Sequence, residues 1–446
     1  MPKRHKVALI AELNLIFSSH FLRDKRFGME ESMANIKPFK CIRPAQGKAS
    51  QIAALPYDVY SSAEAREVVD GDNYSFLRID RAETQFDEDI AVNDPRVYEK
   101  ARELLDGMIE NGDFITDNDD KYYIYELTMN GRTQTGIVAC SSIDDYCNNV
   151  IKKHENTRED KELDRINHVD VCSAQTGPIF LAYRSNKKIN EIIAKNKENE
   201  PIYDFVADDG ITHKVWEIDA KEDVENIHSE FDGINDIYIA DGHHRAASAV
   251  KVGLRRREAN PNYDGTEEFN FFLSVLFPDE ELMIMDYNRV VKDYNGYDLD
   301  QLIAKIEEYF TVECMDEGKV RPSKKCEFGM YTKGKWYRLE AKTDKMDLTD
   351  PVKQLDVDIL QKYLLEPILG IKDPRTDKRI DFIGGIRGLE EIERRAELDM
   401  EIGFSMYPTS INELFQVADK GMLMPPKSTW FEPKLRSGLF IHRIEG

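Results

Sequence analysis

The spacing of apolar and polar positions along the chain predicts a mixture of helices and strands. Residues 95–112 begin with proline and carry apolar residues at helical spacing, which predicts an amphipathic helix. Residues 121–143 hold two β-rich runs around Asn130-Gly131, the strongest sequence signal for a hairpin. Residues 269–278, FNFFLSVLFP, form the most apolar run and are expected to be a central strand. The fold class predicted is α+β, with mixed sheets and helices.

Three further segments give less regular patterns. We expect a strand at residues 73–80, NYSFLRID, and a helix at residues 350–365. Residues 150–170, VIKKHENTREDKELDRINHVD, are expected to form a charged helix. On such a helix His154, Arg158 and Arg165 would fall near one face.

The stretch Tyr238 to Ala249, YIADGHHRAASA, carries the densest chemistry. Its apolar beginning has the length of a short buried strand, and Asp241-Gly242 then breaks that strand. From Arg245 onward the alanine-rich sequence favours a helix. The prediction is a strand, a tight turn and a helix.

Several groups at this turn suit an anion. Asp241 can cap the helix, Gly242 lets the backbone approach a ligand, and the free N–H groups of a first helical turn attract negative charge. His243, His244 and Arg245 add hydrogen-bonding or cationic groups. The alternative is an ordinary Asp-Gly turn before a helix, with two incidental histidines.

Length and composition favour a globular protein of more than one domain. The chain has 446 residues, of which 41% are hydrophobic. We expect a main α/β domain at 34–296 and a C-terminal α/β part at 297–446 that packs on it. We expect residues 1–33 to be an N-terminal extension outside the main domain. It would be either a weak mimic of a signal peptide or an over-extended start, with Met29 or Met33 as the more natural first residue.

The charge narrows the classes of partner. A net charge of -23 repels nucleic acid and acidic membranes, so we expect a small-molecule substrate, no nucleic acid and no membrane. No run of eighteen apolar residues is present. The six cysteines are scattered and contain no CxxC pair, which favours a reducing cytoplasm. A homodimer is one assembly that the sequence leaves open.

A second cluster of charge lies at residues 152–165. Its basic side chains gather in an otherwise acidic protein, where they could hold a phosphate or a carboxylate. The alternative is a solvated helix joined by salt bridges. A zinc-protease motif is excluded, because Arg158 stands where the second histidine after His154-Glu155 would have to be.

Seven segments together resemble one bacterial and archaeal family of unknown function, from Ile36 to the C-terminus. They are IKPFKCIRP, LPYDVYS, NYSFLRID, QTGIVAC, VIKKHENTREDKELDRINH, YIADGHHRAASA and MPPKSTWFEPKL. Within them, DGHHR is similar to the phosphate-binding turn of the ParB/sulfiredoxin superfamily. It is similar in particular to that of free serine kinases, which phosphorylate L-serine with ADP or ATP.

The resemblance implies a nucleotide-dependent phosphotransferase, a kinase of L-serine or of a similar hydroxyl compound, that uses ADP or ATP with Mg²⁺. It implies that Asp241 is catalytic and binds the metal. It also implies that the nucleotide contacts the following four residues, Gly242, His243, His244 and Arg245.

The chemistry of phosphoryl transfer suggests roles for the remaining candidates. Glu155 or Asp58 would orient the acceptor hydroxyl, although a lone aspartate in a loop such as that of Asp58 is more often a turn or cap residue. The substrate-binding candidates are His154, Arg158 and Arg165, which would clamp the carboxylate or a second phosphate.

Two other functions use the same residues. One is a phosphatase or other hydrolase of a small phosphorylated metabolite. The other is a nucleotide-sensing regulatory protein, although the acidic composition and the lack of an evident helix-turn-helix weigh against DNA binding.

Overall fold

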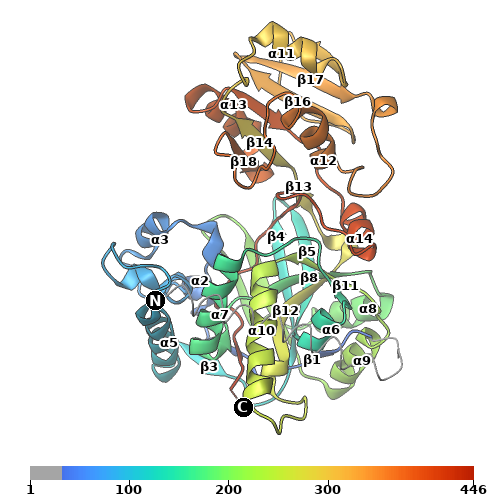
Figure 1. Cartoon of the computed structure of the whole chain (residues 1–446). Coiled ribbons are helices and arrows are strands. Elements are labelled where there is room, and N and C mark those ends of the chain that lie inside the picture. The colour runs from blue at the N-terminus through green and yellow to red at the C-terminus, as the bar shows by residue number, and fades with distance from the viewer. Residues whose placement is uncertain (1–32, 446) are drawn as a thin grey trace.

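The chain folds into two lobes, each built around one β-sheet (Figure 1). The computed structural model describes residues 33–445. The expectation for an N-terminal extension therefore concerns residues that, apart from Met33, lie outside the described part. The α+β class with mixed sheets is confirmed, since both sheets combine with helices.

The lower lobe contains a nine-stranded sheet, in the order β6-β11-β8-β12-β5-β4-β10-β9, with β1 also pairing with β5. Its strands are β1 (Ile36–Lys37), β4 (Tyr122–Met129), β5 (Arg132–Ser142), β6 (Ile151–Lys152), β8 (Ile179–Tyr183), β9 (Tyr203–Val206), β10 (Thr212–Ile218), β11 (Ile237–Asp241) and β12 (Phe271–Pro278). The hairpin at Asn130-Gly131 is confirmed between β4 and β5, and both turn residues have positive φ. The central position of β12 is confirmed, because it lies between β8 and β5 and is buried throughout.

Helices cover one face of this sheet. The covering helices are α6 (Ile143–Cys147), α8 (Lys187–Asn196), α9 (Lys221–Phe231) and α10 (His243–Ala259). Helix α7 (Glu159–Cys172) packs on α10, and α5 (Pro95–Glu110) packs on α7, which confirms the helix predicted at 95–112. Gly253 allows α10 to approach closely, because a Cβ there would lie 2.3 Å from the carbonyl oxygen of Phe269.

The opposite face of the sheet is covered by the C-terminal part of the chain. Phe415 of α14 (Ile411–Asp419) stacks on Tyr238 with ring centroids 3.8 Å apart, and Phe440 packs against Tyr123 and Tyr125. This core continues into the upper lobe, so the two lobes share one hydrophobic interior.

Short elements at the N-terminal side form a separate cluster against α5 and α7. They are α2 (Ala49–Ile52), η2 (Tyr57–Val59), α3 (Ser62–Val69), α4 (Leu77–Asp80) and η3 (Ala82–Gln85), with the paired strands β2 (Ile42–Pro44) and β3 (Phe114–Thr116). The strand predicted at 73–80 is wrong. Asp72 accepts hydrogen bonds from the amides of Tyr74 and Ser75, which turns the chain into α4 instead.

The upper lobe contains a six-stranded sheet in the order β15-β17-β16-β19-β14-β18. Its elements are β14 (Tyr287–Val291), α11 (Leu299–Ile306), β15 (Phe310–Cys314), β16 (Glu327–Thr332), β17 (Lys335–Ala341), η6 (Thr343–Lys345), α12 (Asp356–Leu360), η7 (Gln361–Leu365), β18 (Ile380–Gly384), η8 (Gly385–Arg387), α13 (Gly388–Leu398) and β19 (Ile402–Ser405). The helix predicted at 350–365 is helical only from Asp356. The expected division at residues 296 and 297 stays a prediction about domains, but the second sheet already includes β14.

The chain returns to the lower lobe after β19. There β20 (Trp430–Phe431) pairs with the earlier strand β13 (Ile284–Met285), and β21 (His442–Arg443) pairs with β7 (Ala174–Gln175). Two further 3-10 turns, η4 (Glu268–Asn270) and η5 (Asp279–Glu281), flank β12. The end of the chain therefore lies beside the C-terminal half of α10, where Arg256 donates to the carbonyl oxygen of Ile444 at 2.7 Å. The N-terminus of α10 consequently points toward the upper lobe (Figure 1).

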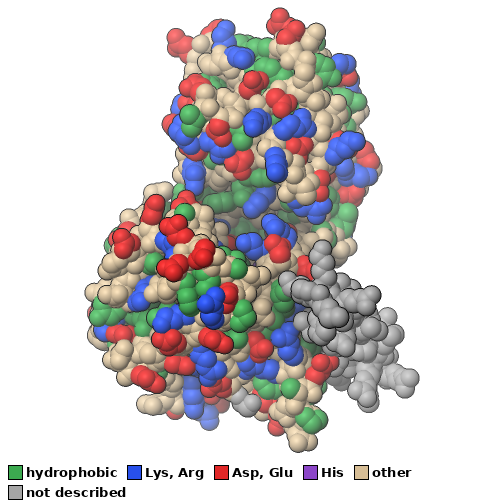
Figure 2. All heavy atoms as spheres, turned by 60° about the vertical axis from the view of Figure 1, so that its left-hand side comes forward, with side chains coloured by type: hydrophobic (Ala, Val, Ile, Leu, Met, Phe, Trp, Pro, Cys, Tyr) green, Lys and Arg blue, Asp and Glu red, His purple; other side chains and the backbone are tan. Residues whose placement is uncertain are grey.

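The surface carries both signs of charge. Figure 2 shows acidic and basic side chains interspersed over one face of both lobes. The molecule is narrower where the two lobes meet. Among residues 33–445, no helix combines the length and the apolar character that crossing a membrane requires.

A buried carboxyl in α6 makes the stability of the fold depend on pH. Asp145 is 4% exposed and accepts a hydrogen bond from the amide of Asn35 at 2.6 Å. Burial raises the pKa of Asp145 to about 7, against the opposing effect of this hydrogen bond. The folded state therefore favours the protonated carboxyl, and the chain loses stability as the pH rises from about 4 through about 7.

We expect Asp145→Asn to remove this loss, because the amide keeps an acceptor oxygen and carries no charge. Relative to the native chain, the variant should gain roughly 4 kcal/mol of unfolding free energy at pH 8.5 and about 1.5 kcal/mol at pH 5. Urea unfolding at both pH values measures the gain. The exposed Asp119→Asn is the control, and an equal gain at both pH values would contradict the assignment.

Candidate functional site

Strand β11 and helix α10 meet at Gly242, which confirms the predicted strand, turn and helix. Gly242 has a φ of 91°, in the left-handed region that glycine adopts without strain, and no side chain caps the helix there. The expectation that Asp241 caps α10 is wrong, because its carboxylate accepts a hydrogen bond from the amide of Gly242 at 2.7 Å, before the helix begins. The first turn of α10 thus has no side-chain cap, an arrangement that suits an anion.

Arg245 folds back over this turn and faces a pocket. Its guanidinium donates to the carbonyl oxygen of Pro178 at 2.6 Å, and a Cβ on Gly242 would lie 3.1 Å from the guanidinium. We call the adjoining pocket the arginine pocket; its polar lining is Tyr57, Asp80, Arg165, His168, Gln175, Thr176, Arg245 and Ser437. Two arginines therefore face one pocket beside a helix N-terminus.

The helix predicted at residues 150–170 begins only at Glu159, so the expected alignment of its basic residues is wrong. His154 lies in a loop between β6 and α7, and Arg158 is the N-cap of α7. The helical pattern fails because β6 pairs with β11, and because the carbonyl oxygen of His154 accepts a hydrogen bond from the amide of Met424 at 2.8 Å.

This loop nevertheless contacts the turn at Gly242. The rings of His154 and His243 meet edge to face with centroids 4.5 Å apart. The amide of Arg158 donates to Nε2 of His244 at 2.9 Å. Because β6 and β11 are parallel neighbours, the segments that follow them emerge at the same edge of the sheet. The two stretches that the sequence analysis singled out are therefore adjacent in space.

The two candidate arginines of this stretch differ in position. The side chain of Arg158 is 71% exposed, and its guanidinium pairs with Asp160 at 2.8 Å. Arg165 is buried on α7, pairs with Asp164 and stacks on Tyr57 at 4.0 Å. Arg165 thus faces the arginine pocket, whereas Arg158 contributes its backbone amide near the turn.

The candidate carboxylates Asp58 and Glu155 both reach the surroundings of the turn. Asp58 belongs to η2 and is exposed, and its charge acts on His244 and on Lys434. Glu155 is exposed beside the two buried rings of His154 and His243. Both carboxylates therefore lie at the edge of the site.

The neighbours of Asp241 stabilise the charged form of its carboxyl group. Burial alone would raise the pKa of Asp241, but the charges of Lys434 and Arg245 and the amide of Gly242 hold it well below its usual range. The Nζ atom of Lys434 lies 3.0 Å from Oδ2 of Asp241. The pKa of Lys434 is in turn raised by Asp241 and Glu432, although burial opposes this.

Sequence reasoning missed several residues of the site. It assigned no role to Lys434 or Lys427, nor to Asp80, Thr176 and His168 of the arginine pocket. One signal was available for the lysines, because both belong to the segment MPPKSTWFEPKL, which combines cations with turn residues. No local pattern distinguishes the pocket residues, since the fold brings them together from segments far apart in the sequence.

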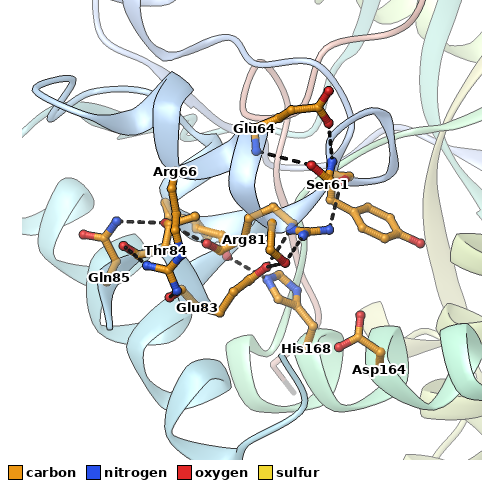
Figure 3. Close-up of polar contacts among 12 residues, drawn as sticks. Ser61, Glu64, Arg66, Arg81, Glu83, Thr84, Gln85, Asp164 and His168 are labelled. Carbon is orange, nitrogen blue, oxygen red and sulfur yellow. Dashed lines mark hydrogen bonds and ion pairs between the residues drawn. The ribbon is translucent and has the colours of Figure 1, made fainter. Parts of the chain in front are cut away.

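Ion pairs and hydrogen bonds around Arg81 and Glu83 link η3 to α3, close to His168 of the arginine pocket (Figure 3). Arg81 pairs with Glu83 at 2.7 Å, and Arg66 donates to the carbonyl oxygen of Glu83 at 2.8 Å. His168 contacts the carbonyl oxygen of Ile79 at 3.1 Å, and Thr176 donates to Asp80 at 2.9 Å. The contacts of His168 and Thr176 hold α4 against α7 and the segment that follows α7.

Comparisons with known proteins give little beyond the family. No curated protein matches the chain. A free serine kinase variant in complex with AMP is similar with a TM-score of 0.35 and 13% identity, over 68% of this chain and 91% of that chain. Truncated SbnI from Staphylococcus aureus has a TM-score of 0.37 and 10% identity, over 68% and 87%. Likenesses of this size carry no argument about activity.

One family matches most of the chain. It is described as "Protein of unknown function (DUF1015)", and the match covers residues 36–358. The expected membership of a family of unknown function is confirmed. The chain belongs to the DUF1015 family.

Proposed function

We propose that the chain is a nucleotide-dependent phosphotransferase that acts on a small hydroxyl compound. One observation carries the proposal: the uncapped N-terminus of α10 opens beside the cations of Arg245, Arg165 and Lys434. Free amides and fixed positive charges are what the phosphates of a nucleotide require.

The remaining groups divide into donor and acceptor sides. On the donor side, the amides of the first turn of α10 and the guanidinium of Arg245 bind phosphate oxygens. On the acceptor side, Arg165 in the arginine pocket holds a carboxylate such as that of L-serine. Asp58, which is exposed near His244, orients the acceptor hydroxyl.

Asp241 suits Mg²⁺ when nucleotide is bound. Mg²⁺ in such sites is held by one or two carboxylates together with substrate phosphates, and it neutralises charge on the transferred group. Asp241 remains ionised across the physiological range, since Lys434 and Arg245 hold its pKa low against the effect of burial. Each of its oxygens accepts one hydrogen bond and keeps a second lone pair.

Calorimetry against ADP, ATP and CTP with Mg²⁺ tests nucleotide binding, followed by a screen of hydroxyl acceptors that includes L-serine. The proposal predicts binding of ADP or ATP and transfer of phosphate to an acceptor. Release of phosphate from a phosphorylated metabolite without nucleotide would indicate the hydrolase. Binding without transfer to any acceptor would indicate the sensor, and absence of binding would exclude the phosphotransferase.

Arg245→Ala should weaken binding of ADP by roughly 10- to 100-fold, because a charge-assisted hydrogen bond contributes about 1.5–3 kcal/mol. Titration calorimetry measures the change. Arg375→Ala is the matched control, since Arg375 is an exposed arginine of the upper lobe that pairs with Asp373. Equal affinities for the two variants would count against phosphate binding at this turn.

A further inference from the structure

Two buried imidazoles beside the turn have nitrogen atoms without partners. His154 is 2% exposed and His243 is 6% exposed. Among residues 33–445, neither ring nitrogen of His154 has a hydrogen-bond partner, and Nε2 of His243 has none either. A buried polar atom without a partner costs free energy, so an unpartnered nitrogen on each of two facing rings indicates a ligand that bonds to both rings.

A carboxylate completes this group. One donor atom from each of His154, Glu155 and His243 lies within 4.8 Å of the other two. Ligands of a tetrahedral metal with bonds of about 2.1 Å lie roughly 3.4 Å apart, so closing the site takes movements of about one ångström. Glu155 is exposed, whereas the backbone of His154 is held by the amide of Met424 and that of His243 belongs to the first turn of α10.

The neighbouring histidine does not belong to this group. Nε2 of His244 already accepts the hydrogen bond from the amide of Arg158, so its ring is engaged. The charge of Asp241 acts on both His154 and His243 and favours a cation, whereas Lys153 near His243 and Lys427 near Glu155 oppose one.

We propose that His154, Glu155 and His243 bind one divalent first-row transition metal, of which Zn²⁺ is the representative probe. Two imidazoles and one carboxylate suit such ions, whereas Mg²⁺ prefers oxygen ligands throughout. Three protein ligands leave one position of a tetrahedral site open. The site differs from Asp241, the residue proposed for Mg²⁺, and its binding of metal does not depend on the proposed function.

The position of this site gives it a chemical use. His243 belongs to the first turn of α10, so a metal there lies beside the place where an anion would bind. An open coordination position at that point suits an oxygen of a phosphate or a water molecule.

Equilibrium dialysis of the full, chelator-stripped chain against Zn²⁺ without nucleotide tests the site, with Co²⁺ absorption as a second readout of tetrahedral coordination. The native chain should bind one equivalent. Glu155→Gln and His154→Gln should each lower the affinity by at least about 100-fold, the upper end of what loss of an outer-shell partner costs.

Matched controls are Glu159→Gln, an exposed glutamate in the first turn of α7, and His228→Gln, a half-exposed histidine of α9. Both should bind Zn²⁺ like the native chain. If His154→Gln fails to fold, as judged by circular dichroism, the exposed Glu155→Gln decides alone. Failure of the native chain to bind one Zn²⁺, or unchanged affinity of Glu155→Gln, would overturn the proposal.

Discussion

Asp241→Asn is expected to lower Mg²⁺-dependent phosphoryl transfer by about 1,000-fold, the scale on which loss of one preorganised charged or polar group acts. The substitution keeps the acceptor for the amide of Gly242 but removes the charge that Lys434 and Arg245 surround. The turn therefore becomes more positive. Without Mg²⁺, the variant should bind ADP at least as tightly as the native chain does, because a negative charge beside the phosphates is gone.

Asp236→Asn is the matched control for Asp241→Asn. Asp236 immediately precedes the same strand, β11, and also pairs with a lysine, Lys152, at 2.8 Å. Transfer rates and ADP titrations on both variants separate a role at the turn from a general loss of charge. Equal turnover by the two variants would contradict the role of Asp241, as would weaker metal-free binding of ADP by Asp241→Asn.

Gly242→Ala is expected to weaken ADP binding by roughly 30-fold, or about 2 kcal/mol. A side chain here is strained at a φ of 91°, and its Cβ would lie 3.1 Å from the guanidinium of Arg245. Arg245 must then move away from the turn. The loss of ADP affinity in Gly242→Ala should therefore be similar in size to the loss in Arg245→Ala, and it should not follow from any loss of folding stability.

Gly265→Ala separates strain from the loss of the phosphate site. Gly265 has a φ of 96°, and a Cβ there has nothing within 4 Å. Both variants should lose about 1–2 kcal/mol of stability to backbone strain, but only Gly242→Ala should lose nucleotide affinity. Thermal unfolding and calorimetry on the same samples provide the comparison, and unaltered ADP binding by Gly242→Ala would exclude the turn.

The sequence predicted elements well where the local pattern and the final environment agree. The hairpin at Asn130-Gly131 and the helix at 95–110 are examples, because turn chemistry and helical spacing decide them locally. The prediction of a helix from residue 150 failed because partners distant in sequence take over. Pairing of β6 with β11 and the hydrogen bond from Met424 hold His154 outside a helix that its own neighbours would favour.

The same reason explains what was missed at the site. The turn from Asp241 to Arg245 is contiguous, so its chemistry could be recognised in the sequence. Lys434 reaches Asp241 across 193 positions of sequence separation, and only the folded chain brings the two together. The prediction that Asp241 caps α10 was wrong by one position, because the N-cap residue of α10 is Gly242.

A structure of the chain crystallised with ADP and Mg²⁺ tests the central claim most directly, because it locates the phosphates. We predict that phosphate oxygens accept hydrogen bonds from the first-turn amides of α10, with the guanidinium of Arg245 in contact. A nucleotide bound elsewhere, with those amides facing only water, would contradict the account.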